Sequence, residues 1–154
     1  MNRRDWLQLT IASLATSAFS RSALYAARST RVTVYKSPTC GCCANWVDHM
    51  KHNGFTIDAH DVDDTMLNQV KSTAGVPLSL RSCHVALANG YAFEGHVPAD
   101  LVKKVLAEKP KLVGLAVPGM PVGSPGMEMG ALRDPYEIVA FDRAGKTWTY
   151  AKRA

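Results

Sequence analysis

The stretch RVTVYKSPTCGCC, residues 31–43, combines a strand pattern with three closely spaced cysteines. β-forming residues fill its first half and Ser37-Pro38-Thr39 ends the run, so the pattern predicts a strand. Apolar residues then recur at helical spacing, which predicts a helix that begins near Cys42 and ends at Gly54. The motif Cys40-Gly41-Cys42-Cys43 is therefore expected between a strand and a helix, where the helix begins.

Further strands and helices follow this beginning. The expected elements are, in order, a strand over 31–36, the helix to Gly54, a strand over 55–62, a helix from Asp63 or Asp64 to Gly75, strands over 85–88 and 91–94, and a helix from Pro98 to Pro110. Asn89-Gly90, between the two later strands, is a strong hairpin signal. The order β-α-β-α-β-β-α predicts an α/β fold with the thioredoxin-like layout, in which a cysteine motif follows the first strand and a proline, here Pro77, precedes the third.

From Pro110 to Pro135 the pattern changes, because five of the eight prolines of the chain fall in this stretch. Residues 117–129, VPGMPVGSPGMEM, have neither a helical nor a strand period. They predict a long loop rich in proline, glycine and methionine, and long loops in small domains often serve a function. A disordered linker is the alternative. Residues 136–141 and 147–150, on either side of a glycine-containing turn, predict a C-terminal β-hairpin.

Residues 1–27 differ from the rest of the chain. A basic head that contains Arg3-Arg4 is followed by a mildly apolar run from Trp6 to Phe19 and by small residues over 22–27. This is the three-part layout of a secretory signal, and the arginine pair resembles the twin-arginine type. We expect residues 1–27 to be removed, and residues 28–154 to form one periplasmic domain of a bacterial cell envelope, without a stable membrane span. An amphipathic first helix and a membrane anchor are the alternatives, although the apolar run is short for a bilayer.

The net charge gives no support for a nucleic-acid partner. The whole chain carries +5, but residues 1–27 contain three arginines and one aspartate, so the remainder carries only +3. Nucleic-acid binding typically uses a stripe of basic residues interleaved with aromatic ones, and the sequence has none. We therefore expect no nucleic-acid partner.

The four cysteines carry the clearest chemical signal. Cys40 and Cys43 form a C-x-x-C pair at a helix N-terminus, where backbone N–H groups and the helix dipole stabilise thiolate. A redox pair needs only two sulfurs, so the extra Cys42 is better explained by a soft metal that several thiolates bridge. Thiolates favour copper(I), and the pattern predicts a copper(I) site with room for a multinuclear cluster. The alternatives are a buried cluster of free thiols, or one disulfide with spare thiols.

The expected fold brings Cys83 to this motif. Cys83 follows Pro77, which faces the cysteine motif in a thioredoxin-like fold, so we expect the fourth sulfur in the site. The weaker candidate ligands are His84, His96, Met120, Met127 and Met129. The methionines qualify because a loop without a helical period offers little core for them to fill. His49 and His52, three residues apart on the first helix, are expected to face solvent.

Five ordered motifs carry a family resemblance. They are Tyr35-Lys36-Ser37-Pro38-Thr39-Cys40-Gly41-Cys42-Cys43, Gly75-Val76-Pro77, Ser82-Cys83-His84, Glu94-Gly95-His96-Val97-Pro98 and the loop from Pro118 to Met129. With these motifs, residues 31–154 resemble the CopG-like family of periplasmic copper-resistance proteins, formerly catalogued as a domain of unknown function. The family pattern often has threonine where this chain has Val85. The resemblance implies a thioredoxin-like fold, copper binding through the four cysteines, and a role in interconverting copper oxidation states.

Three functions are open at this point. The first is an exported copper(I)-binding protein that uses its four cysteines for copper handling and resistance. The second is a thiol–disulfide oxidoreductase that uses Cys40 and Cys43. The third is a copper chaperone that delivers the ion to another periplasmic copper-handling protein. Cys42 and Cys83 favour the first function over the second, because exchange chemistry needs only a pair of thiols. No short motif separates the first from the third.

Overall fold

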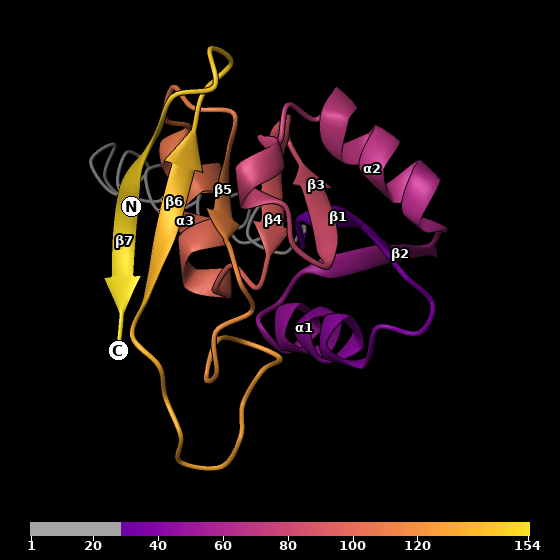
Figure 1. The fold of residues 1–154 in the computed structure, drawn as a ribbon, viewed down its shortest axis with the longest axis vertical. Helices are drawn as coiled ribbons and strands as arrows, with labels where there is room; N and C mark the ends of the chain where they lie inside the picture. The colour runs from indigo at the N-terminus through magenta and orange to yellow at the C-terminus, as the bar shows by residue number, and fades with distance from the viewer. Residues whose placement is uncertain (1–28) are drawn as a thin grey trace, which may run out of the picture.

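The computed structural model of the protein describes residues 29–154 (Figure 1). The expected export signal, residues 1–27, lies outside the described residues. The chain forms strands β1 (Arg31–Lys36), β2 (Thr56–Asp61), β3 (His84–Ala88), β4 (Tyr91–Gly95), β5 (Gly114–Val117), β6 (Tyr136–Phe141) and β7 (Thr147–Arg153), helices α1 (Gly41–His52), α2 (Asp64–Thr73) and α3 (Ala99–Glu108), and the short 3-10 helix η1 (Leu78–Leu80). Within residues 29–154, no helix has both the length and the apolar character that a bilayer crossing needs.

The seven strands of the described residues join one mixed sheet in the order β2-β1-β3-β4-β5-β6-β7. β1 pairs with β2 in parallel, as β4 does with β5, and the other neighbours are antiparallel. The predicted α/β class and the predicted order of the first seven elements are confirmed, and so is the hairpin of β6 and β7. Asn89 and Gly90 have positive φ angles of 48° and 84°, which the two-residue turn between β3 and β4 requires.

The helices cover the two faces of the sheet (Figure 1). Trp46 of α1 and Val102 of α3 share one hydrophobic cluster with Ala86 of β3. Leu67 of α2 belongs to a second cluster, with Val85 of β3. Consecutive residues of a strand point to opposite faces, so α1 and α3 lie on one face of the sheet and α2 lies on the other.

The register between β1 and β3 decides where the functional loops meet. Lys36, the last residue of β1, pairs with His84, the first residue of β3. Because the strands are antiparallel, the segment that leads to Cys40 leaves the sheet at the same edge where the chain enters from Cys83. Two cysteine segments that are distant in sequence are therefore neighbours in space.

β5 is the element that the sequence pattern misses, since the change of pattern after Pro110 predicts only a loop. Its four residues are all buried between β4 and β6, so no alternation of polar and apolar residues marks it. Gly114 is required at its start. A Cβ atom there would stand 2.0 Å from the carbonyl oxygen of Ala92 and 2.6 Å from the Phe141 ring.

α3 begins without a side-chain cap of its own. The backbone N–H of Ala99 instead donates to Nε2 of His49, which reaches across from α1, at 3.2 Å. The expectation that His49 faces solvent is therefore wrong, because its ring is half-buried and joins α1 to α3, whereas His52 is exposed as expected. Burial lowers the pKa of His49 below 6.5, which agrees with a neutral ring that accepts a hydrogen bond.

This bond predicts a loss of stability in acid. The unfolded chain binds a proton on His49 more readily than the folded one, so stability is lost as pH falls below about 6.5. We expect His49→Gln, whose amide oxygen can still accept the Ala99 bond, to lose less free energy of unfolding than the parent between about pH 7.5 and 5. Urea unfolding of the metal-free protein at a series of pH values measures this. Equal pH slopes for parent and variant would show that the His49 bond does not couple folding to pH.

Candidate metal centre

The cysteine motif occupies the start of α1. Cys40 is the N-cap residue, and its Sγ accepts a hydrogen bond from the backbone N–H of Cys43 at 3.3 Å. A disulfide joins Cys40 to Cys43, whereas Cys42 has a free thiol 3.5 Å from the Cys40 Sγ. The helix N-terminus thus holds both a redox-capable pair and a spare sulfur, and its backbone favours thiolate once the disulfide is reduced.

Cys83 lies next to this motif because it directly precedes β3, whose first residue pairs with the last residue of β1. It carries a free thiol just before β3. Its Sγ and those of Cys40, Cys42 and Cys43 all lie within 4.8 Å of one another. The fold, rather than the local sequence, assembles this group. All four sulfurs that the sequence suggested as ligands are brought together.

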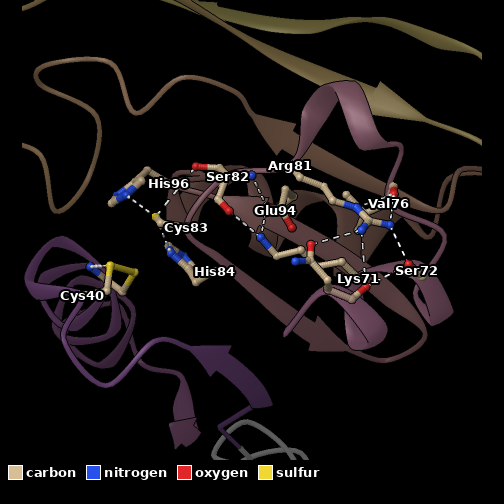
Figure 2. Close-up of polar contacts among 12 residues, drawn as sticks. Cys40, Lys71, Ser72, Val76, Arg81, Ser82, Cys83, His84, Glu94 and His96 are labelled. Atoms are coloured by element: carbon tan, nitrogen blue, oxygen red, sulfur yellow. Dashed lines mark hydrogen bonds and ion pairs between the residues drawn. A yellow bond between two sulfur atoms is a disulfide. The ribbon is translucent and has the colours of Figure 1, made fainter. Parts of the chain in front are cut away.

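Two imidazoles flank Cys83 (Figure 2). His84 Nδ1 lies 3.4 Å from its Sγ, and His96 Nε2 lies 3.3 Å from it. His84 is fully buried, its ring centroid lies 4.6 Å from that of Trp46, and its Nε2 has no hydrogen-bond partner among the described residues. Cys83, His84 and His96 form a second group of metal-ligating atoms, which shares Cys83 with the first.

The tautomer of His96 follows from its contacts. Its Nδ1 lies 2.7 Å from the carbonyl oxygen of Pro125. A carbonyl oxygen only accepts, so Nδ1 carries the proton and Nε2 presents its lone pair to Cys83. The carbonyl fixes both the tautomer and the orientation of the ring, which is how proteins prepare an imidazole for a metal ion.

Burial keeps these side chains uncharged. It raises the pKa of the Cys83 thiol to about 11, with a hydrogen bond from the Ser82 hydroxyl opposing the shift. It lowers the pKa of His96, and lowers that of His84 well below 6.5. At neutral pH the metal-free site therefore holds a thiol between two neutral imidazoles, and neutral imidazole is the form that ligates metals.

The loop over residues 118–135 is anchored on α1, beside which it passes in Figure 1. Gly126 packs so closely there that a Cβ atom would stand 2.7 Å from the backbone nitrogen of Trp46 and 2.8 Å from the carbonyl oxygen of Cys42. The preceding residue, Pro125, accepts the His96 hydrogen bond. Residues 125 and 126 therefore connect the loop both to the cysteine helix and to the imidazole side of the site.

The three methionines suggested as weaker ligands lie in this loop. Met120 and Met129 are 41% and 58% exposed, and Met127 is half-buried. Met127 directly follows the anchored Gly126. It is therefore the methionine of the three that the loop holds beside α1, whereas Met120 and Met129 face solvent.

The sequence analysis overlooks Lys71, although a signal for it exists. Lys71 of α2 is 2% exposed and pairs with the fully buried Glu94 of β4 at 2.7 Å. It follows Leu67 by one helical turn on the buried side of α2. A lysine inside an apolar stripe points to a buried acidic partner, because lysine is almost never fully buried unpaired.

Known proteins resemble this chain in sequence and fold. Residues 80–127, which include Cys83 and His96, match the family described as "Protein of unknown function, DUF411". A solved structure described as copper resistance protein copG, form 1, is 44% identical, with a TM-score of 0.76 over 82% of this chain and 98% of that chain. Form 2 is 42% identical, with a TM-score of 0.75 over 82% of this chain and 100% of that chain. The chain belongs to the CopG-like family. No curated protein matches it significantly.

The donor set of this CopG-like chain fits a soft metal ion. Thiolate sulfur favours copper(I), and imidazole also suits copper. With the disulfide formed, the donors are the thiols of Cys42 and Cys83 and the neighbouring imidazoles; reduction of the disulfide adds two sulfurs. Opening and closing the disulfide therefore changes the number of soft donors at the site by two.

Because Gly126 packs directly against the backbone of α1, we expect the loop to detach from α1 when this residue gains a side chain. Gly126→Ala would combine a positive φ of 87° with the contacts on α1, whereas Gly119→Ala, at a φ of 81°, has open space around its Cβ atom. Both changes strain the backbone by about 1–2 kcal/mol. Only Gly126→Ala should add an overpacking cost of about 1–3 kcal/mol and speed proteolytic cleavage within 118–135. Equal cleavage rates for the two variants would show that the loop does not depend on this contact.

Proposed function

We propose that this chain is an exported copper-handling protein that binds copper(I) through its four cysteines and serves copper resistance. The observation that carries the proposal is the convergence of four sulfur atoms within 4.8 Å of one another, from two separate segments. A structural disulfide needs only two of them, and spare thiols are at risk of oxidation in an oxidising compartment. The two solved relatives described as copper resistance proteins support copper as the ion.

The proposed setting is a thioredoxin-like unit exported to the periplasm. The strand order β2-β1-β3-β4, with a cysteine motif directly after β1, supports the thioredoxin-like assignment. The signal-like layout of residues 1–27 supports export, by the twin-arginine route, and removal of that segment. Residues 28–154 would then be the mature copper-binding domain.

The number of ions follows from the preference of copper(I) for two or three soft ligands. Two sulfurs suffice for one ion, so four sulfurs within 4.8 Å of one another suit several ions that share bridging thiolates. His84 and His96, both against Cys83, would serve as auxiliary ligands. Met127, beside the anchored part of the loop, would be a further weak one.

The Cys40–Cys43 pair supports a role in changing the oxidation state of copper. When its S–S bond breaks, the pair takes up two electrons and two protons and becomes two thiols. Two copper(I) ions supply these electrons when each is oxidised to copper(II). In the reverse direction, the two thiols close the disulfide, release two protons and reduce two copper(II) ions to copper(I).

A thiol–disulfide oxidoreductase is the second candidate. The observation that favours it is the disulfide between Cys40 and Cys43 at the start of α1, which is the arrangement that thiol exchange needs. This function uses two sulfurs only. It leaves the positions of Cys42 and Cys83 without a purpose, and the copper proposal is therefore preferred.

Removal of the other two cysteines separates these candidates. Cys42→Ser and Cys83→Ser should each lower the copper-to-protein ratio by about one ion or more, because the bridging sulfurs are lost. Both variants should still close the Cys40–Cys43 disulfide. Anaerobic copper(I) titration of the reduced protein, with metal counted by elemental analysis, measures the ratio.

The control replaces a possible ligand far from the cluster. His52→Gln removes an exposed imidazole and should leave the copper ratio unchanged. If both cysteine variants bind as much copper as the parent and keep full disulfide-exchange activity on a model disulfide, the four-sulfur site is wrong and the oxidoreductase is the better assignment.

Export is tested separately. The protein isolated from the native cell envelope should begin between about Ala23 and Thr30, as read by N-terminal sequencing. Replacement of Arg3-Arg4 by two lysines should block export by the twin-arginine route. A soluble cytoplasmic protein that retains Met1 would contradict the export proposal and leave the copper site untouched.

A further inference from the structure

The buried ion pair of Lys71 and Glu94 binds the backbone of Ser82, the residue before Cys83 (Figure 2). Oε1 of Glu94 accepts a hydrogen bond from the backbone N–H of Ser82, and Nζ of Lys71 donates to the backbone carbonyl oxygen of the same residue. The two charged groups also bind each other at 2.7 Å. Both polar groups of the Ser82 backbone are thus held by one carboxylate and one ammonium group.

The cost of this pair argues against a purely stabilising role. Lys71 and Glu94 are 2% and 0% exposed, and Oε2 of Glu94 has no hydrogen-bond partner among the described residues. Desolvation of two charges often outweighs their attraction, and an apolar pair of similar volume is frequently as stable or more so. The ion pair differs from an apolar pair in that it fixes a neighbouring peptide by directional bonds.

The surrounding contacts direct this restraint to the thiol. Glu94 of β4 reaches Ser82, and His96, the residue directly after β4, reaches Cys83. Gly95, between them, lies so close that a Cβ atom would stand 3.1 Å from the Ser82 side chain. Arg81, on the other side of Ser82, is bound to the carbonyl oxygen of Val76 after α2. Residues of both α2 and β4 therefore bind the segment before Cys83. The Cys83 thiol itself lies beside the cysteines at the start of α1.

We propose that Lys71 and Glu94 are positioning residues that set the place of the Cys83 thiol relative to Cys42. Neither residue touches the sulfur cluster. They act through the Ser82 peptide, whose direction fixes the next Cα–Cβ bond. An effect of the two residues on copper binding rests on the proposed function. An effect on the distance between the Cys42 and Cys83 thiols does not, because it can be measured without metal.

The test removes the charges together, because either single change would leave a lone buried charge and could unfold the protein. Lys71→Met/Glu94→Leu loses both bonds to Ser82. Lys71→Met/Glu94→Gln keeps an amide oxygen that can accept from the Ser82 N–H, and should show an intermediate effect. The matched control is Lys152→Met/Glu137→Leu, which removes an exposed ion pair of the β6–β7 hairpin by the same substitutions.

The first measurement needs no metal. With the Cys40–Cys43 disulfide formed, Cys42 and Cys83 are the free thiols, and dibromobimane becomes fluorescent when it bridges two of them. The rate of bridging, divided by the rate at which a monofunctional alkylating reagent labels each thiol, reports their relative placement. We expect this ratio to fall about tenfold or more in Lys71→Met/Glu94→Leu, since misplacement by about 1 Å can slow a proximity-dependent reaction by up to ~100-fold. Thermal unfolding should remain cooperative, with a midpoint lowered only by the loss of the two bonds to Ser82.

The second measurement is copper(I) retention against a chromophoric copper(I) chelator. Loss of a residue that orients a metal ligand typically weakens binding by about 10–100-fold, and we expect this range for Lys71→Met/Glu94→Leu and no change for the control. A lower bridging ratio with unchanged copper binding would uphold the positioning role and count against Cys83 as a copper ligand. An unchanged bridging ratio in a folded variant would overturn the proposal. So would failure of both double variants to fold, which would make the pair a requirement of the fold itself.

Discussion

The antiparallel register of β1 and β3, with Lys36 opposite His84, is the constraint on which the candidate site depends. It joins the end of one strand to the beginning of another, so that the turn into α1 and the approach to β3 share one edge. Because side chains alternate along a strand, a slip of one residue would turn His84 away from Trp46 and into the opposite core. The buried side chains of both faces resist such a slip. The hydrophobic cores thus fix the register of β1 and β3, and with it the positions of the sulfurs, as well as stabilising the fold.

The sequence predicts those features that local chemistry dictates. The helix after the cysteine motif and the Asn89-Gly90 turn arise from residues adjacent in the chain, and both appear in the structure. β5 escapes prediction because its neighbours in the sheet, rather than its own alternation, make it a strand. His49 escapes for a similar reason, since its partner Ala99 lies fifty residues away. Cys83 could be placed beside the motif only through the expected topology, and its imidazole neighbours only as weaker candidates.

Burial decides the protonation states of Cys83, His84 and His96. Burial disfavours charge, so the thiol of Cys83 stays protonated, with its pKa raised to about 11, and His84 and His96 stay neutral. Exchange of a thiol proton for a singly charged copper(I) ion leaves the net charge of such a site unchanged. A doubly charged ion at the same sulfur would add a charge that the buried surroundings penalise. On the proposed function, this environment favours the lower oxidation state while the cysteines are reduced.

The loop over residues 118–135 determines where the sequence of such a protein can accept insertions and substitutions. Its ends emerge from β5 and β6, which are neighbours in the sheet, and residues 125 and 126 anchor its middle. The closure entropy of a loop grows slowly, by about 0.6 kcal/mol for a doubling of length. The exposed stretch from Met129 to Leu132 is therefore a place where insertions and new side chains cost the fold little. The exposed surface of the loop can therefore diversify there while residues 125 and 126 and the cysteine framework stay constant.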